Sequence, residues 1–292
     1  MATLTTSSPT ASASSSSSDL AAQIRREATK STLRALGRGV LTFVLTLVVV
    51  IVLWVGLLWI FQVPNLVGKG PIDVWNYLFT MPNSEANRTR LLGELWVTLG
   101  HSVLGFVAGL VAALVIAVLF QLSKGIEAAL MPLAMLLRSV PLVAMAPVII
   151  LIFGRDAASI AVLGGIVVLF PALVNIVFGL RSASPQMNDV IAVYGGSAWI
   201  ALRKVALPSS LPAFFAAVRI SVPGAVTGAL LAEWLAVGTG IGGSINGSIA
   251  QAQFSGVWSG IVLVTAVALI VYNLVQIVED VVLARMGMTP QT

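Results

Sequence analysis

Six apolar stretches, each longer than twenty residues, restrict what this chain can fold into. They cover residues 40–61, 95–120, 127–153, 160–180, 213–236 and 257–278. About twenty consecutive apolar residues let a helix cross the hydrocarbon core of a bilayer. The composition agrees, since 58% of the residues are apolar, 9% are charged and the mean hydropathy is +1.01. The sequence therefore predicts an all-α polytopic membrane protein with about six transmembrane helices, in a domain that occupies residues 40–292.

The first 39 residues are too polar to belong to that domain. Residues 1–18 consist mostly of Ser, Thr and Ala, with eight serines, and are predicted to be disordered. Residues 19–39 carry five basic side chains and are interpreted as a helix that approaches the membrane surface. A secretory signal peptide is the alternative. However, the stretch 40–61 exceeds the roughly 7–15 residues of a signal h-region, and no convincing cleavage site follows it.

The basic residues predict the orientation in the membrane. With the N-terminus inside, ten Lys and Arg residues fall on inner segments and four on outer segments. The inner ones are Arg25, Arg26, Lys30, Arg34, Arg38, Lys124, Arg181, Arg203, Lys204 and Arg285, and the outer ones are Lys69, Arg88, Arg90 and Arg155. Cytoplasmic loops carry the excess of positive charge. Both termini are therefore expected in the cytoplasm, and the net charge of +5 reflects topology rather than binding to nucleic acid.

The residue types that most enzymes need are scarce. The chain has no cysteine and one histidine, and its few acids do not cluster, so no catalytic residue, metal site or cofactor is expected. It also lacks the GxxxxGK[ST] loop that binds ATP phosphates. The one Gly-Lys pair, Gly68 and Lys69, is followed by another glycine. Any step that uses ATP therefore needs a partner protein.

The polar loop 181–212 is too long to be a simple turn between two membrane helices. It predicts a short helix over 190–194, a glycine break at 195–196 and a second helix over 197–205 that ends before Pro208. Membrane helices flank the loop and hold both of its ends, so the loop can form a rigid protruding surface on which another protein docks.

Three motifs carry a family resemblance. The first motif is a cytoplasmic signature of the family: an acidic residue, a glycine six positions later and then Leu-Pro. Here these are Asp189, Gly195 and Leu207-Pro208, with aspartate where the family more often has glutamate. The stretch 137–154, LRSVPLVAMAPVIILIFG, has prolines and then an apolar run that ends in Phe-Gly. Glu233 lies in AEWLAVGTGIG near the end of the fifth stretch. Over about residues 65–285 the chain resembles the permease subunit of a bacterial ABC importer, a binding-protein-dependent transport inner-membrane component of the nitrate, sulfonate and taurine branch.

The resemblance implies the type I importer (MetI-like) permease fold in the bacterial inner membrane, with the loop 181–212 as the coupling loop. It implies as partners a pair of cytoplasmic ABC ATPase subunits, an extracytoplasmic substrate-binding protein and a second copy of the permease in a homodimer within the lipid. The solute would be small and anionic. The residues expected to contact the ATPase are Asp189, Gly195, Gly196, Ser197, Arg203, Lys204, Leu207 and Pro208. Those expected to line or gate the translocation path are Pro141, Pro147 and Glu233.

Three further polar residues lie within or beside the apolar stretches. His101 is interpreted as a helix-packing residue, and Arg138 and Arg219 as arginines that extend to the cytoplasmic surface. An ion-coupled secondary transporter is the alternative function, for which only Glu233 and His101 could serve as coupling groups. Copurification of a separate ATPase would distinguish the two.

Glycines recur at four-residue spacing in or beside several stretches and predict close helix packing. The pairs are Gly105/Gly109, Gly224/Gly228 and Gly256/Gly260. A glycine-rich link is expected over residues 237–256.

Overall fold

A computed structural model describes residues 41–288 of this protein, so the predicted tail and approach helix at 1–39 lie outside the described residues. The described chain divides into two units, residues 41–64 and 65–288. In the first unit, the helix Leu41–Ile60 has 20 residues and a mean hydropathy of 3.0. It is long and apolar enough to cross a membrane, as predicted for the stretch 40–61.

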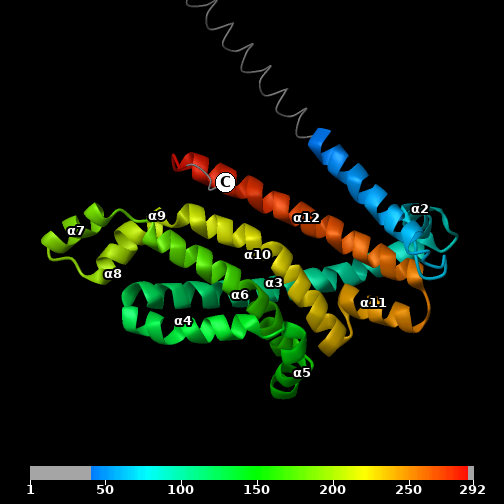
Figure 1. Ribbon diagram of the computed structural model, residues 1–292, viewed down its shortest axis with the longest axis horizontal. Helices are drawn as coiled ribbons and strands as arrows, with labels where there is room; N and C mark the ends of the chain where they lie inside the picture. The colour runs from blue at the N-terminus through cyan, green and yellow to red at the C-terminus, as the bar shows by residue number, and fades with distance from the viewer. Residues whose placement is uncertain (1–40, 289–292) are drawn as a thin grey trace, which may run out of the picture. The chain divides into compact units, whose positions relative to one another are not determined.

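Three long helices form the centre of the second unit. They are α3 (Ser84–Leu122), α6 (Ala157–Arg181) and α10 (Leu211–Ala232), and they pack against one another (Figure 1). A fourth long helix, α12 (Phe254–Arg285), packs on α10. All four have apolar windows long enough to cross a bilayer. The core between α3 and α6 contains several alanines, such as Ala113, Ala117 and Ala172, which allow these helices to lie close together, as well as the large side chain of Phe120.

Glycine backbones touch at the point where α3, α6 and α10 meet. A Cβ atom added to Gly105 would lie 2.8 Å from the Cα of Gly164, and one added to Gly228 would lie 2.7 Å from the same Cα. Such contacts are possible only where side chains are absent. The predicted close packing is thus confirmed at Gly105 of the pair Gly105/Gly109 and at Gly228 of the pair Gly224/Gly228. Gly164, which joins them, was not singled out in the sequence.

The expected third span, 127–153, is not one continuous helix. It consists of α4 (Lys124–Ser139) and α5 (Leu142–Phe153), which are separated at Val140 and Pro141. The residue before a proline avoids the α-helical region, and the proline has no N–H to continue the ladder. The described residues therefore contain five helices long enough to span a membrane, plus this broken pair.

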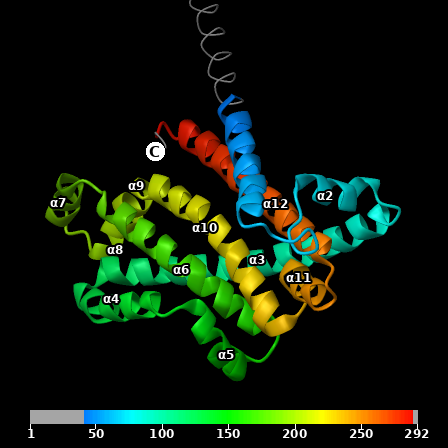
Figure 2. The ribbon, with the colours of Figure 1, turned by 45° about the vertical axis from the view of Figure 1, so that its right-hand side comes forward.

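Shorter helices cover the ends of the second unit. One end carries α2 (Pro71–Trp75), the π-helix η1 (Asn76–Thr80) and α11 (Gly240–Ala250). The other end carries the polar loop with α7 (Pro185–Val193) and α8 (Ala198–Ala201) (Figure 2). The segment expected as a glycine-rich link at 237–256 thus contains a helix of 11 residues. Side chains from other parts of the chain accept hydrogen bonds from the first backbone N–H groups of this helix: Thr98 accepts from Ile241 and Glu233 accepts from Gly242.

Candidate functional site

The polar loop folds as two short helices around a glycine break. The first helix, α7 (Pro185–Val193), starts five residues earlier than predicted because Pro185 suits the first turn of a helix. The chain then reverses at Gly195, whose φ is +73°, a value that side chains other than glycine rarely adopt. The N–H of Gly196 donates to the carbonyl of Ile191 at 2.8 Å and closes the turn.

The second half of the loop is longer than predicted. Ser197 caps α8 (Ala198–Ala201), as expected, with its hydroxyl accepting from a backbone N–H at 3.4 Å. The chain continues through η2 (Leu202–Ala206) and α9 (Leu207–Ser209). Pro208 does not end the helix, because it lies in the first turn of α9, where its missing N–H costs nothing.

The loop has one anchored side and one exposed side. Leu202 and Ala206 are each 2% exposed and belong to the core cluster between α3 and α6. On the other side Val193 and Tyr194 are 84% and 87% exposed, and Trp199 is also exposed. Exposed large apolar groups in a polar loop are candidates for contact with a partner. None of the three was proposed as a contact residue from the sequence, although Tyr194 and Trp199 are aromatic residues inside a polar segment, a signal that could have found them.

The residues expected to contact an ATPase lie along this loop but differ in exposure. Asp189, Arg203, Lys204 and Pro208 are exposed, whereas Leu207 is half-buried. Where the loop begins, Arg181 at the end of α6 forms an ion pair with Glu127 of α4.

Glu233 lies in a buried polar cluster at the other end of the unit. It starts the π-helix η3 (Glu233–Val237) and is fully buried. Its Oε2 accepts hydrogen bonds from the Thr98 hydroxyl and the Gly242 N–H, each at 2.9 Å. Its Oε1 lies 2.8 Å from Nδ1 of His101. The Thr98 hydroxyl in turn accepts from the N–H of Ile241 at 2.8 Å.

This cluster joins α3, η3 and the start of α11. A buried carboxylate is tolerated where several donors satisfy it, and here two side chains and one backbone N–H do so. That backbone N–H, from Gly242, is one of the first N–H groups of α11, which have no partner within that helix. Thr98 was not singled out in the sequence, because a threonine inside an apolar helix gives no signal of its own.

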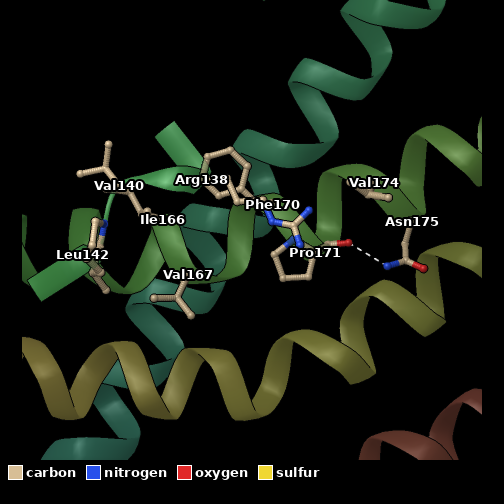
Figure 3. Close-up of a pocket in the computed structure, with 10 residues that line it drawn as sticks. Arg138, Val140, Leu142, Ile166, Val167, Phe170, Pro171, Val174 and Asn175 are labelled. Atoms are coloured by element: carbon tan, nitrogen blue, oxygen red, sulfur yellow. Dashed lines mark hydrogen bonds between the residues drawn. The ribbon is translucent and has the colours of Figure 1, made fainter. Parts of the chain in front are cut away.

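The three predicted path residues lie in different surroundings. Pro141 lies at the break between α4 and α5 and lines the cavity drawn in Figure 3. Pro147 lies inside α5 on an exposed face, and Glu233 is buried against α3 and α11. Their role in a path therefore stays a prediction.

The interpretation of Arg219 as an arginine that extends to the surface is wrong. Its Nη1 lies 3.4 Å from Oε2 of Glu279, and these side chains are 17% and 0% exposed. The pair joins α10 to α12. Arg138, by contrast, lies beside the middle of α6 rather than at the cytoplasmic end of a span.

Comparison with known proteins identifies the family. The family of binding-protein-dependent transport system inner membrane components matches residues 105–283, which include the polar loop and Glu233. The chain belongs to this family. Its members are transport permeases rather than enzymes, and the permease described here is a multi-pass membrane protein. Within residues 41–288, no three His, Asp or Glu side chains gather as a metal site requires.

Relatives of this permease carry different transport names. A probable ABC transporter permease protein of Haemophilus influenzae is 33% identical over 173 residues, 57% of this chain and 68% of the relative. The putative aliphatic sulfonates transport permease protein SsuC of Bacillus subtilis is 33% identical over 132 residues, 45% and 48% of the two chains. The nitrate import permease protein NrtB of Synechococcus elongatus is 24% identical over 129 residues, 44% and 46%. The chain thus spans about two-thirds of the first relative and about half of the other two.

A solved structure shows the same fold. The crystal structure of an amino acid ABC transporter with histidines contains a chain that superposes with a TM-score of 0.51 at 18% identity. The match covers 69% of this permease and 97% of that chain. It agrees with the predicted all-α, MetI-like permease fold.

Proposed function

We propose that this permease is the membrane subunit of an ATP-driven importer for a small anionic solute. An external binding protein delivers the solute, and a separate pair of ATPase subunits drives transport through residues 189–208. The relatives named for aliphatic sulfonates and nitrate support the class of solute. Two copies of the permease form the working unit, since one chain has one such loop and an ATPase pair presents two docking sites. The loop and both termini lie in the cytoplasm.

The observation that carries this proposal is the geometry of the polar loop. Leu202 and Ala206 fix it to the core, so a force on the exposed Tyr194 and Trp199 is transmitted to α3 and α6 rather than absorbed by a loose connection. Gly195 sets the angle between the two halves through its positive φ. The loop can therefore couple movement of a docked partner to movement of the membrane helices.

The test is uptake by vesicles that contain the permease and its copurified ATPase. Gly195→Val forces a β-branched residue into a left-handed backbone, at a strain of about 1–3 kcal/mol, and should re-aim the exposed side. We expect normal expression, weak ATPase docking and lost uptake. Gly195→Ala should reduce uptake nearly as much. No atom lies within 4 Å of the added Cβ, so the effect of the substitution comes from backbone strain at a φ of +73° and not from a steric contact.

Gly287 supplies a matched control. Its φ is +68° and it also has nothing within 4 Å, but it lies after α12 at the end of the described chain. Gly287→Val should carry the same strain and keep uptake. Normal ATP-driven uptake by the Gly195→Val protein would remove the coupling role from the loop.

One observation favours the alternative of an ion-coupled secondary transporter. His101 and Glu233, the two groups that such a mechanism needs, lie 2.8 Å apart and are largely shielded from solvent. The same vesicles decide between the two functions. An importer driven by an ATPase keeps its uptake when an uncoupler collapses the proton gradient, and a proton-coupled carrier loses it.

A further inference from the structure

A cavity of about 500 Å³ lies where the helix break between α4 and α5 faces α6 (Figure 3). Its lining residues are Arg138, Val140, Pro141, Leu142, Ile166, Val167, Phe170, Pro171, Val174 and Asn175. It is mainly apolar, with the guanidinium of Arg138 and the amide of Asn175 as polar side-chain groups. Figure 3 shows the Arg138 side chain extending toward α6 at Phe170 and Pro171.

The cavity lies at the middle of a membrane-spanning helix. On α6 it begins at Ile166, nine residues after Ala157, and ends at Asn175, six residues before Arg181. At about 1.5 Å per residue these positions are about 14 Å and about 9 Å from the two ends of the helix. The hydrocarbon core of a bilayer is about 30 Å thick. The Arg138 side chain, which is exposed on the described chain, therefore lies beside the middle of a membrane-spanning helix, where an unpaired charge is costly.

Arg138 has no anionic partner in the described part of the chain. The ion pairs there join other residues: His101 with Glu233, Arg181 with Glu127 and Arg219 with Glu279. The cavity lining contains no Asp or Glu. Ionisable groups inside a membrane almost always pair with an opposite charge or mark the path of a substrate. An arginine beside an apolar cavity therefore indicates an anion supplied from outside the chain.

Other polar groups at the cavity fit an anion as well. The Asn175 Nδ2 donates to the Pro171 carbonyl at 2.8 Å, and its second N–H remains to donate. The N–H groups of Ala144 and Met145 donate to the Pro141 carbonyl, whereas those of Val143 and of Leu142, which lines the cavity, have no partner within α5. Their partial positive charge adds to that of the guanidinium.

We propose that this cavity binds a small organic oxyanion, a sulfonate or carboxylate, and that Arg138 recognises its charge. The apolar wall formed by Val167, Phe170 and Val174 accepts the short carbon part of such a molecule. A guanidinium offers two parallel N–H donors that match two oxygens of one anionic group. The inference rests on the proposed function, because an anion site at this depth serves a chain that moves solute across the membrane.

Because the chain has no native cysteine, a cysteine introduced at the cavity is the one thiol that a reagent can label. Val174 lines the cavity and is 59% exposed, so the thiol of a Val174→Cys variant should react with a methanethiosulfonate reagent. The full-length variant is purified in lipid nanodiscs and labelled at constant ionic strength. Methanesulfonate should slow labelling, whereas dimethyl sulfone, a neutral molecule of similar shape, should not. Equal protection by both molecules, or by neither, overturns the proposal.

Substitution of the arginine tests its role in the same background. Arg138→Gln should raise the methanesulfonate concentration needed for half-protection at least about tenfold, the ratio that the loss of one charged hydrogen bond produces. Arg138→Lys keeps the positive charge and should lose less. Arg155→Gln removes an equal charge from the turn before α6, outside the cavity, and should change nothing. Protection that is unchanged in Arg138→Gln overturns the proposal.

The outcome is separable from that of the proposed function. If ATP-driven uptake is observed but protection does not depend on Arg138, the anion site is wrong and the importer stands. If protection depends on Arg138 but no ATP-driven uptake occurs, the anion site stands and the importer is wrong.

Discussion

Gly105→Ala should weaken the contact between α3 and α6, although alanine is the better helix former. The added Cβ would lie 2.8 Å from the Cα of Gly164 and 3.1 Å from its carbonyl carbon. Carbon atoms prefer a separation of about 3.5–4.0 Å, so the two helices must move apart by about 0.7 Å or more. Both atoms belong to a helix backbone, which cannot turn aside as a side chain can. Overpacking of this kind costs about 1–3 kcal/mol, against a propensity gain of at most about 1 kcal/mol. After a propensity gain of about 1 kcal/mol, the expected net loss is up to about 2 kcal/mol.

Gly100→Ala on the same helix is the matched control. Gly100 is exposed and an added Cβ meets nothing within 4 Å, so only the propensity gain of about 0.5–1 kcal/mol applies. Thermal unfolding of the purified protein in detergent measures both variants. A change of 1 kcal/mol shifts the midpoint by roughly 2–4 °C in a chain of this size, so Gly105→Ala should lower it and Gly100→Ala should raise it. If Gly105→Ala raises the midpoint as much as Gly100→Ala does, the backbone contact at Gly164 is refuted.

Three further predictions follow from the buried polar contacts and the polar loop. Thr98→Val should destabilise the protein by about 1–3 kcal/mol in detergent unfolding, because it leaves the buried N–H of Ile241 without an acceptor, whereas Thr98→Ser keeps the hydroxyl and should lose less. Arg219→Gln should cost about 3–5 kcal/mol in the same assay, because Glu279 stays buried without its partner, and adding Glu279→Gln should restore most of that loss. A double variant as unstable as Arg219→Gln alone would contradict this. A single thiol in Ser197→Cys should react with an impermeant reagent in inverted membrane vesicles and not in intact cells, and labelling from outside would reverse the proposed orientation.

Local sequence features predicted most of the helices. Hydropathy predicted the positions of the long helices. A segment in lipid must pair its own backbone N–H and C=O groups, and an α-helix is one of the few structures that does so. The glycine break at Gly195 and the cap at Ser197 were also predicted, because both depend on the backbone of a few neighbouring residues. Element ends were predicted less well. Pro208 was expected to stop a helix and instead lies in the first turn of another, since a proline can end one helix or start the next.

Only the tertiary structure decided which distant residues meet. Thr98 and Glu233 are 135 positions apart and share a hydrogen bond. Gly164 contacts Gly105 of α3 and Gly228 of α10, and Arg138 faces the middle of α6. Each of these contacts depends on which faces of two helices pack together and at what height. The hydrophobic pattern fixes neither, because lipid and a neighbouring helix are equally apolar surroundings for a membrane helix. The sequence determined where the chain crosses the membrane and where it must bend, and the packing determined which of its few polar groups are paired and which remain open to a ligand.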